Sequence, residues 1–183
     1  MGRGVPLLGR TPSCRKNMSD RFVILLDGSI GVGKSTMGRQ LALRFGGSFV
    51  DGDDHKTKGK PWYCSSLKTC RSILGTSIQA LEVKSFVFIS RPVRCLDWLY
   101  FNKHFEQTGT KVHMIGLQAS FENITNEARG RAFSQGERER MTEMISEGYG
   151  ARSYSDFYMR TDRQSIEATA NTLEARLRTL TNT

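Results

Sequence analysis

Apolar residues along the chain fall into two patterns. Short continuous runs rich in β-branched and aromatic residues predict strands that are buried on both faces. These runs are residues 22–26, 48–51, 85–90 and 111–117, with a shorter candidate at 155–159. Longer stretches with helical periodicity separate them. The stretches that predict helices are residues 37–45, 66–81, the segment after Pro92, and about 120–147 with a break near 134–136.

A final helix completes this order. Thr161-Asp162-Arg163-Gln164 has capping-box spacing, and the apolar face that follows consists of Ile166, Ala170, Leu173, Leu177 and Leu180. Alternating strands and helices predict an α/β domain in three layers, with about five parallel strands and helices on both faces. Ligands of such sheets bind beyond the carboxyl ends of the strands. We therefore expect the segments after the first three strands to converge on one site.

The segment after the first strand carries the strongest motif. It reads Gly28-Ser29-Ile30-Gly31-Val32-Gly33-Lys34-Ser35-Thr36 and fits G-x-x-x-x-G-K-[ST] between a strand and a helix. The glycines let backbone N–H groups surround a phosphate chain, and the helix adds its positive end. Lys34 can reach the β- and γ-phosphates, and the Ser35 hydroxyl can bind Mg²⁺. The motif predicts a P-loop NTPase fold that binds a nucleoside triphosphate, with ATP as the default because no guanine-selecting Asn-Lys-x-Asp pattern is present.

Size and charge narrow the classes of function. The 183 residues suit a single domain, which we place at residues 20–183. The net charge is +9, and residues 1–17 contribute four Lys or Arg and no acid. We expect residues 1–19 to be a basic, disordered leader. The remaining positive charge forms no long run, so a nucleic-acid partner is disfavoured.

The sequence also argues against membrane-spanning, secreted and zinc-binding proteins. No apolar run approaches the ~20 residues that cross a bilayer, and the leader lacks the apolar core of a secretory signal. The cysteines and histidines show no paired metal-ligand spacing. These features predict a cytoplasmic protein with reduced cysteines, no membrane partner and no structural zinc. Its oligomeric state is left open between monomer and homodimer.

An acidic turn follows the second strand. Asp51-Gly52-Asp53-Asp54 opens at the same sheet edge as the phosphate loop. Phosphoryl transfer needs Mg²⁺ on the phosphates and a carboxylate that accepts the proton of the acceptor hydroxyl. We assign Asp51 as a ligand of Mg²⁺ or of its water and Asp53 as the base. The alternative is a solvated turn, in which Asp and Gly are ordinary residues.

The phosphate loop followed by Phe49-Val50-Asp51-Gly52-Asp53 resembles the compact P-loop kinases of small metabolites, namely shikimate, gluconate and adenylylsulfate kinases. The resemblance implies Mg²⁺-dependent transfer of the ATP γ-phosphoryl group to a hydroxyl of a metabolite, nucleoside, nucleotide or antibiotic. The chain lacks the Gly-Glu-x-x-Phe-Arg segment of the shikimate type and the Lys-Gly-Leu-Tyr segment of the adenylylsulfate type. The resemblance therefore implies the reaction and leaves the acceptor open.

The resemblance also implies a helical lid at about residues 120–152. Such lids bring guanidinium groups onto the transferred phosphoryl group, and Arg129 or Arg131 can take this role. An exposed helix with two surface arginines explains them equally well. Lys56, Lys58, Lys60, Trp62 and Tyr63 are candidate acceptor contacts, with a polar loop as the alternative.

A second class of function stays open. In it, the chain is a nucleotide-gated binding protein that hydrolyses NTP slowly and recognises a macromolecule such as RNA. Ser90 at the end of the third strand argues against this class, because switch and motor NTPases commonly have a Mg²⁺-binding Asp there. The two classes differ in whether a small-molecule acceptor stimulates ADP production.

Overall fold

A computed structural model describes residues 21–56 and 66–183. The predicted leader at residues 1–19 and the candidate acceptor contacts Lys58, Lys60, Trp62 and Tyr63 lie outside the described residues. Within the described ranges, no helix combines the length and the apolar character that a membrane crossing requires.

The described strands form one sheet in the order β2-β3-β1-β4-β5, and every pair is parallel. They are β1 (Phe22–Asp27), β2 (Ser48–Asp51), β3 (Phe86–Ser90), β4 (Lys111–Gln118) and β5 (Phe157–Arg160). Leu26 of β1 pairs with Ser90 on one side and Ile115 on the other, so the strands end at a common edge. The predicted parallel sheet is confirmed.

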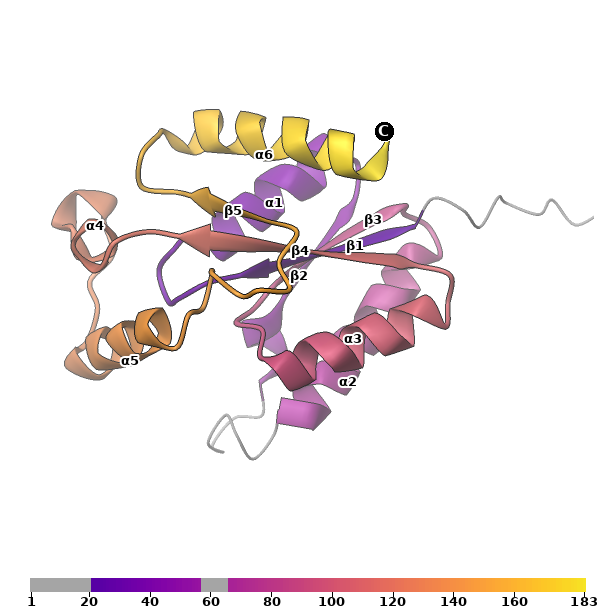
Figure 1. The fold of residues 1–183 in the computed structure, drawn as a ribbon, viewed down its shortest axis with the longest axis horizontal. Helices are drawn as coiled ribbons and strands as arrows, with labels where there is room; N and C mark the ends of the chain where they lie inside the picture. The colour runs from indigo at the N-terminus through magenta and orange to yellow at the C-terminus, as the bar shows by residue number, and fades with distance from the viewer. Residues whose placement is uncertain (1–20, 57–65) are drawn as a thin grey trace, which may run out of the picture.

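Helices cover both faces of this sheet (Figure 1). On one face lie α1 (Lys34–Arg44) and α6 (Ile166–Thr181), and on the other lie α2 (Ser66–Leu81) and α3 (Cys95–Glu106). Alternate residues of β1 enter different cores: Ile24 and Leu26 pack with the first pair of helices, whereas Val23 and Leu25 pack with the second. Burial on both faces explains why β1 is apolar without alternation. The three-layer α/β fold is therefore confirmed.

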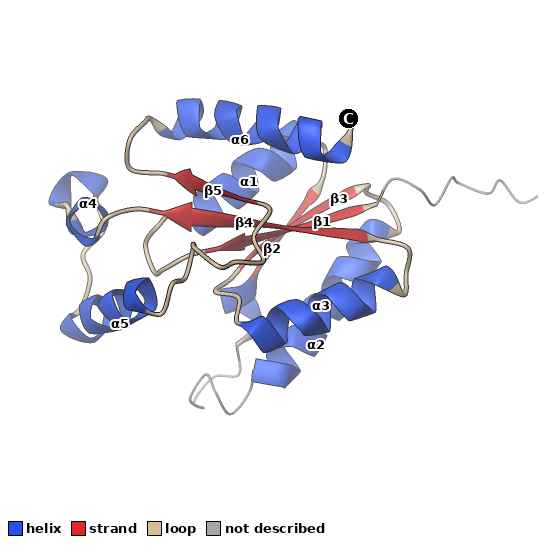
Figure 2. Ribbon diagram, viewed as in Figure 1, coloured by secondary structure: helices blue, strands red, loops and turns tan. Residues whose placement is uncertain are grey.

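The lid region lies beyond the carboxyl ends of the strands (Figure 2). It consists of α4 (Phe121–Thr125), the 3₁₀ turn η3 (Glu127–Arg129) and α5 (Gln135–Ser146). The predicted helix with a break only near 134–136 is wrong, because no α-helix covers residues 126–134. Side-chain caps explain the interruption: Asn126 accepts a hydrogen bond from Ala128 N, and Ser134 forms a capping box with Glu137.

The start of the last helix also differs from the prediction. Ser165 caps α6, so the capping box expected at residues 161–164 does not form. Asp162 instead accepts hydrogen bonds from Ser120 N at 2.9 Å and Asn123 Nδ2 at 3.0 Å, and it pairs with Arg160. Of the predicted apolar face, Ala170, Leu173 and Leu177 are buried, Leu180 is partly buried and Ile166 is exposed. Asp162 therefore connects the base of the lid to the loop before α6.

Replacing Asp162 with Asn is expected to lower the free energy of unfolding by about 1–3 kcal/mol at neutral pH. The Arg160 guanidinium and then the donors from Ser120 and Asn123 lower the pKa of Asp162 against the opposing effect of burial. When the pKa of a carboxyl group is lower in the folded than in the unfolded protein, its charge stabilises the folded state. This stabilisation is complete above the unfolded pKa of about 3.9 and is lost as the pH falls below it.

Urea titrations from pH 7 to pH 2 measure this effect. The difference in free energy of unfolding between the native protein and Asp162→Asn should narrow below about pH 4, where the carboxyl group of the unfolded chain becomes protonated. Glu122→Gln removes an exposed acid nearby and should leave the profile unchanged. A difference that stays constant across this range would contradict the assigned role of the Asp162 charge.

Candidate active site

The phosphate loop, residues 28–36, connects β1 to α1. Gly33 precedes the helix with a φ of 102°, a left-handed conformation that residues with side chains seldom adopt. Gly31 lies against the lid, where an added Cβ would be 2.6 Å from Ile124 Cγ2 and 2.7 Å from Phe133 Cζ. The first turn of α1 has unpaired backbone N–H groups and the positive end of the helix dipole. The loop therefore has the geometry of an anion site.

The ammonium group of Lys34 lies inside this loop. Its Nζ donates hydrogen bonds to Gly28 O at 3.0 Å and to Ser29 O at 2.7 Å. Burial lowers the pKa of Lys34 to about 8, while nearby carboxylates, Asp27 foremost, oppose the shift. Residues 30–36 line the adjoining cavity, whereas Gly28 and Ser29 contribute the carbonyl groups that hold the lysine.

Two hydroxyl groups meet where α1 approaches the end of β3. The Oγ atoms of Ser35 and Ser90 are 3.1 Å apart, and Asp51 pairs with Ser90 in the strand register. One Asp51 oxygen accepts a hydrogen bond from Asp53 N at 3.2 Å, and the other is 3.5 Å from Arg39. Among the described residues, no group of three or more His, Cys, Asp or Glu side chains forms a metal centre. These oxygen donors nevertheless fit Mg²⁺, which takes one or two protein ligands beside phosphates and water.

Asp53 lies on the 3₁₀ turn η1 (Gly52–His55), directly after β2. Its Oδ1 atom is 2.7 Å from Lys56 Nζ, and both side chains are more than half exposed. Both residues line the same cavity as the phosphate loop. An accessible carboxylate at this position can accept a proton from a hydroxyl group bound beside the phosphates.

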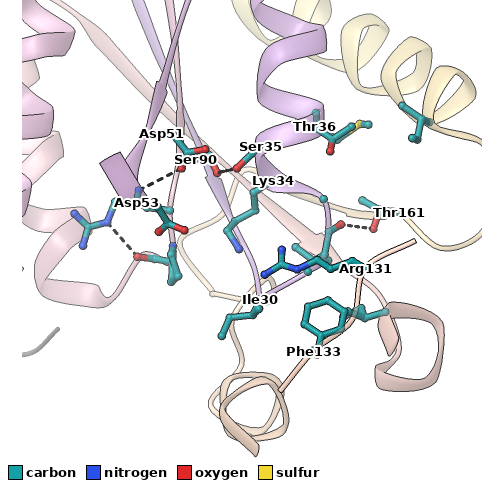
Figure 3. A pocket seen from close by; sticks show the side chains of 18 of the residues that line it. Ile30, Lys34, Ser35, Thr36, Asp51, Asp53, Ser90, Arg131, Phe133 and Thr161 are labelled. Carbon is teal, nitrogen blue, oxygen red and sulfur yellow. Dashed lines mark hydrogen bonds between the residues drawn. The ribbon is translucent and has the colours of Figure 1, made fainter. Parts of the chain in front are cut away.

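The lid contributes Arg131 to the cavity wall. Its guanidinium lies 4.6 Å from the ring centre of Phe133 and 3.2 Å from a Glu137 oxygen. Figure 3 shows this guanidinium pointing toward Lys34. Arg129 belongs to η3, but its side chain lies outside the described part of the structure, so its predicted role remains a prediction.

Sequence reasoning missed Asp27, the last residue of β1. Its side chain is fully buried, and its two oxygens accept hydrogen bonds from Val93 N at 2.7 Å and Gly150 N at 2.8 Å. Burial raises the pKa of Asp27, although these N–H groups oppose the shift. The carboxylate thus joins the start of the phosphate loop to the loop after β3 and to the segment after the lid. The sequence feature that could have indicated Asp27 is a charged residue at the end of an otherwise apolar strand.

These groups surround a cavity of about 350 Å³. In Figure 3, Asp51, Asp53 and Ser90 lie on one side of Lys34, and Thr161, Arg131 and Phe133 lie on the other. The structure therefore brings together the phosphate loop, the acidic turn and one lid arginine, as the sequence predicts. Ser90, at the end of the third strand, and Lys56, a candidate acceptor contact from the sequence, line the same cavity.

Comparisons with known proteins were made with the sequence and with the structure. No family model and no curated protein matches the sequence. A gluconokinase from Sinorhizobium meliloti 1021 matches the structure with a TM-score of 0.59 at 14% identity, covering 89% of this chain and 98% of that chain. A shikimate kinase from Acinetobacter baumannii in complex with shikimate matches with a TM-score of 0.53 at 17% identity, covering 87% of this chain and 92% of that chain.

A fungal RNA kinase also matches, with a TM-score of 0.55 at 16% identity, covering 87% of this chain and 86% of that chain. These similarities concern the fold, since all three identities are low. Together with the parallel sheet, they show that this chain has a P-loop fold of the shikimate and gluconate kinase type. The resemblance inferred from the phosphate loop and the acidic turn is confirmed at this level.

Replacing Asp27 with Ala is expected to lower the free energy of unfolding by about 2–4 kcal/mol. The substitution leaves the N–H groups of Val93 and Gly150 without their buried acceptor. Urea denaturation followed by circular dichroism measures the loss. Asp54→Ala is the matched control, because Asp54 is an exposed acid in the same protein. Equal stability of the two variants would contradict the bridging role of Asp27.

Proposed function

We propose that this protein transfers the γ-phosphoryl group of ATP to a hydroxyl group of a small molecule. The observation that carries the proposal is that the phosphate loop and the acidic end of β2 line one cavity. A site that only binds nucleotide has no need of an exposed carboxylate facing the phosphates. A kinase needs one within reach of the acceptor hydroxyl.

Different residues of the chain would bind the phosphates and the Mg²⁺ ion. The N–H groups at the start of α1 and the Lys34 ammonium hold the β- and γ-phosphates. Ser35 and Asp51, with Ser90 beside them, are the residues that would hold Mg²⁺. Bound Mg²⁺ would neutralise charge on the phosphates. Lys34 would exchange the carbonyls of Gly28 and Ser29 for phosphate oxygens when the nucleotide binds.

Asp53 is the proposed base for the transfer. The acceptor oxygen forms a bond to the γ-phosphorus while the bond from that phosphorus to the bridging oxygen breaks, and ADP leaves. The hydroxyl proton passes to the Asp53 carboxylate. Lys56 Nζ lies 2.7 Å from that carboxylate and would have to share it with the incoming hydroxyl. Arg131 would neutralise the charge that develops on the transferred group as the lid closes.

The acceptor is proposed as a small molecule for two reasons. The phosphate loop, Asp53 and Lys56 line one cavity of about 350 Å³, which is within the range of small-molecule sites. Two of the structural neighbours are named for small hydroxylated acids, gluconate and shikimate. One structural neighbour is an RNA kinase, so the end of a polynucleotide is the competing class of acceptor. The assay must therefore include an RNA.

ADP release with ATP and Mg²⁺ across a panel of acceptors tests the proposal. The panel spans sugars and sugar acids, shikimate, nucleosides, nucleotides, adenylylsulfate, antibiotics and a short RNA with a free 5′-hydroxyl, with Lys34→Ala protein as the blank. One small acceptor should raise ADP release at least about tenfold in a Lys34-dependent manner. A flat panel from protein that binds ATP would overturn the kinase proposal in favour of a nucleotide-gated binder. Stimulation by RNA alone would overturn the small-molecule class.

Asp53→Asn is expected to lower kcat by about 100-fold or more while ATP still binds, because a positioned general base contributes about 10²–10⁴ in rate. The amide keeps the shape of the side chain but cannot accept the proton. Steady-state kinetics and ATP titration of the same preparation separate the two effects. Asp54→Asn, one residue further on, should retain activity. A fully active Asp53→Asn protein would remove Asp53 from the reaction.

A further inference from the structure

The part of the lid that carries Arg131 has little structure of its own. Residues 131–133 lie in no helix or strand, and among the described residues no backbone-to-backbone hydrogen bond involves them. Between residues 125 and 140, Phe133 is the one buried residue among those whose burial is described. Arg131 itself is exposed. Its position therefore depends on side-chain contacts and not on secondary structure.

The aromatic ring of Phe133 makes the first of these contacts. Its edge faces Gly31, where an added Cβ would lie 2.7 Å from Cζ and 3.2 Å from Cε1. Phe133 is 9% exposed and belongs to the same core cluster as Val32 and Ile124. Because Gly31 and Val32 belong to the phosphate loop, the ring packs against the element that would surround the phosphates. The absence of a side chain at Gly31 gives the ring this place.

Arg131 has two partners in the lid. Its guanidinium carbon lies 4.6 Å from the centre of the Phe133 ring, and one of its nitrogens is 3.2 Å from Glu137 Oε1. The ion pair with Glu137 uses an N–H donor that a phosphate oxygen needs. The face of an aromatic ring attracts the guanidinium and leaves its N–H donors free. The ring contact can therefore persist while Arg131 binds a phosphate oxygen.

We propose that Phe133 is a positioning residue for phosphoryl transfer, whose ring rests against Gly31 and holds the Arg131 guanidinium beside the phosphate site. This inference rests on the proposed function, in which Arg131 neutralises charge on the transferred group. An arginine on an unsupported loop loses conformational freedom when it engages its ligand, which offsets part of the stabilisation that it gives. Phe133 reduces this loss, so it acts on the reaction through Arg131.

Phe133→Leu tests this role, because it removes the ring face and keeps a buried apolar side chain. The probe is ADP with Mg²⁺ and aluminium fluoride, which mimics the transferred phosphoryl group, and ADP with Mg²⁺ alone is the reference. The native protein should bind ADP more tightly when aluminium fluoride is present. Phe133→Leu should weaken binding of the mimic about three- to tenfold, the range of one cation–π contact, and leave binding of ADP alone unchanged. Calorimetry measures both affinities.

A double-mutant cycle shows whether Phe133 acts through Arg131. Arg131→Ala should weaken binding of the mimic at least about tenfold, and adding Phe133→Leu to it should cause no further loss. Phe133→Met keeps more of the volume without a ring and should behave like Phe133→Leu, and it replaces that variant if Phe133→Leu does not fold. Met141→Ala removes packing from the same core cluster and should change the affinities with and without aluminium fluoride by equal factors.

Three results would overturn the inference. Phe133→Leu protein that binds the mimic as tightly as the native protein does would show that the ring contributes nothing. An equal loss of affinity for ADP alone would assign Phe133 to the support of the phosphate loop. A loss that persists in the Arg131→Ala background would show that Phe133 supports the lid without acting through the arginine.

The proposed function fails by different results. If the native protein does not bind ADP, the cavity is not a nucleotide site, and both proposals are overturned. If an acceptor is phosphorylated but aluminium fluoride does not tighten ADP binding, the role of Phe133 falls and the kinase proposal stands. If the predicted coupling is found and no acceptor is phosphorylated, the kinase proposal falls and the role of Phe133 toward a bound phosphoryl group stands.

Discussion

The parallel direction of all the described strands is the constraint on which the site depends. Parallel strands place their carboxyl ends at one edge of the sheet, and each strand there continues into a loop. β1 ends at the phosphate loop, β2 ends at Asp51 and β3 ends at Ser90. The register pairs Asp51 with Ser90 and Ser90 with Leu26, so the ends align closely. Residues far apart in sequence therefore become neighbours through the strand register.

Loops at such an edge have no strand partners, so other bonds must hold them. Buried polar side chains that bind backbone groups of neighbouring loops provide this support. Asp27 accepts from Val93 N and Gly150 N, and Thr161 donates to Val32 O. Each of these bonds links the phosphate loop, or the residue just before it, to a different segment of the chain. The site is consequently held from several directions, which is how a surface of loops can position reacting groups.

The two sides of the phosphate loop differ in chemistry. One side has Asp51, Asp53 and Lys56, which suit a hydroxylated acceptor and its proton. The other side has Arg131, Phe133 and Thr161. The sequence identity to the gluconokinase and the shikimate kinase is low, although the folds match over most of each chain. The likeness therefore concerns the fold, and the residues on either side of the phosphate loop must be argued from this chain's own geometry.

The sequence by itself determined the phosphate loop, the acidic turn and the three-layer fold, because local spacing and strand–helix alternation specify them. It also predicted that residues 28–36, Asp51 and Asp53 converge, since strand ends in a parallel sheet must meet. It did not determine the caps at Asn126 and Ser165, where several polar residues compete for one helix end. Only the tertiary structure revealed the role of Asp27. That role depends on which backbone groups of distant segments come within hydrogen-bond reach, and no local pattern records that.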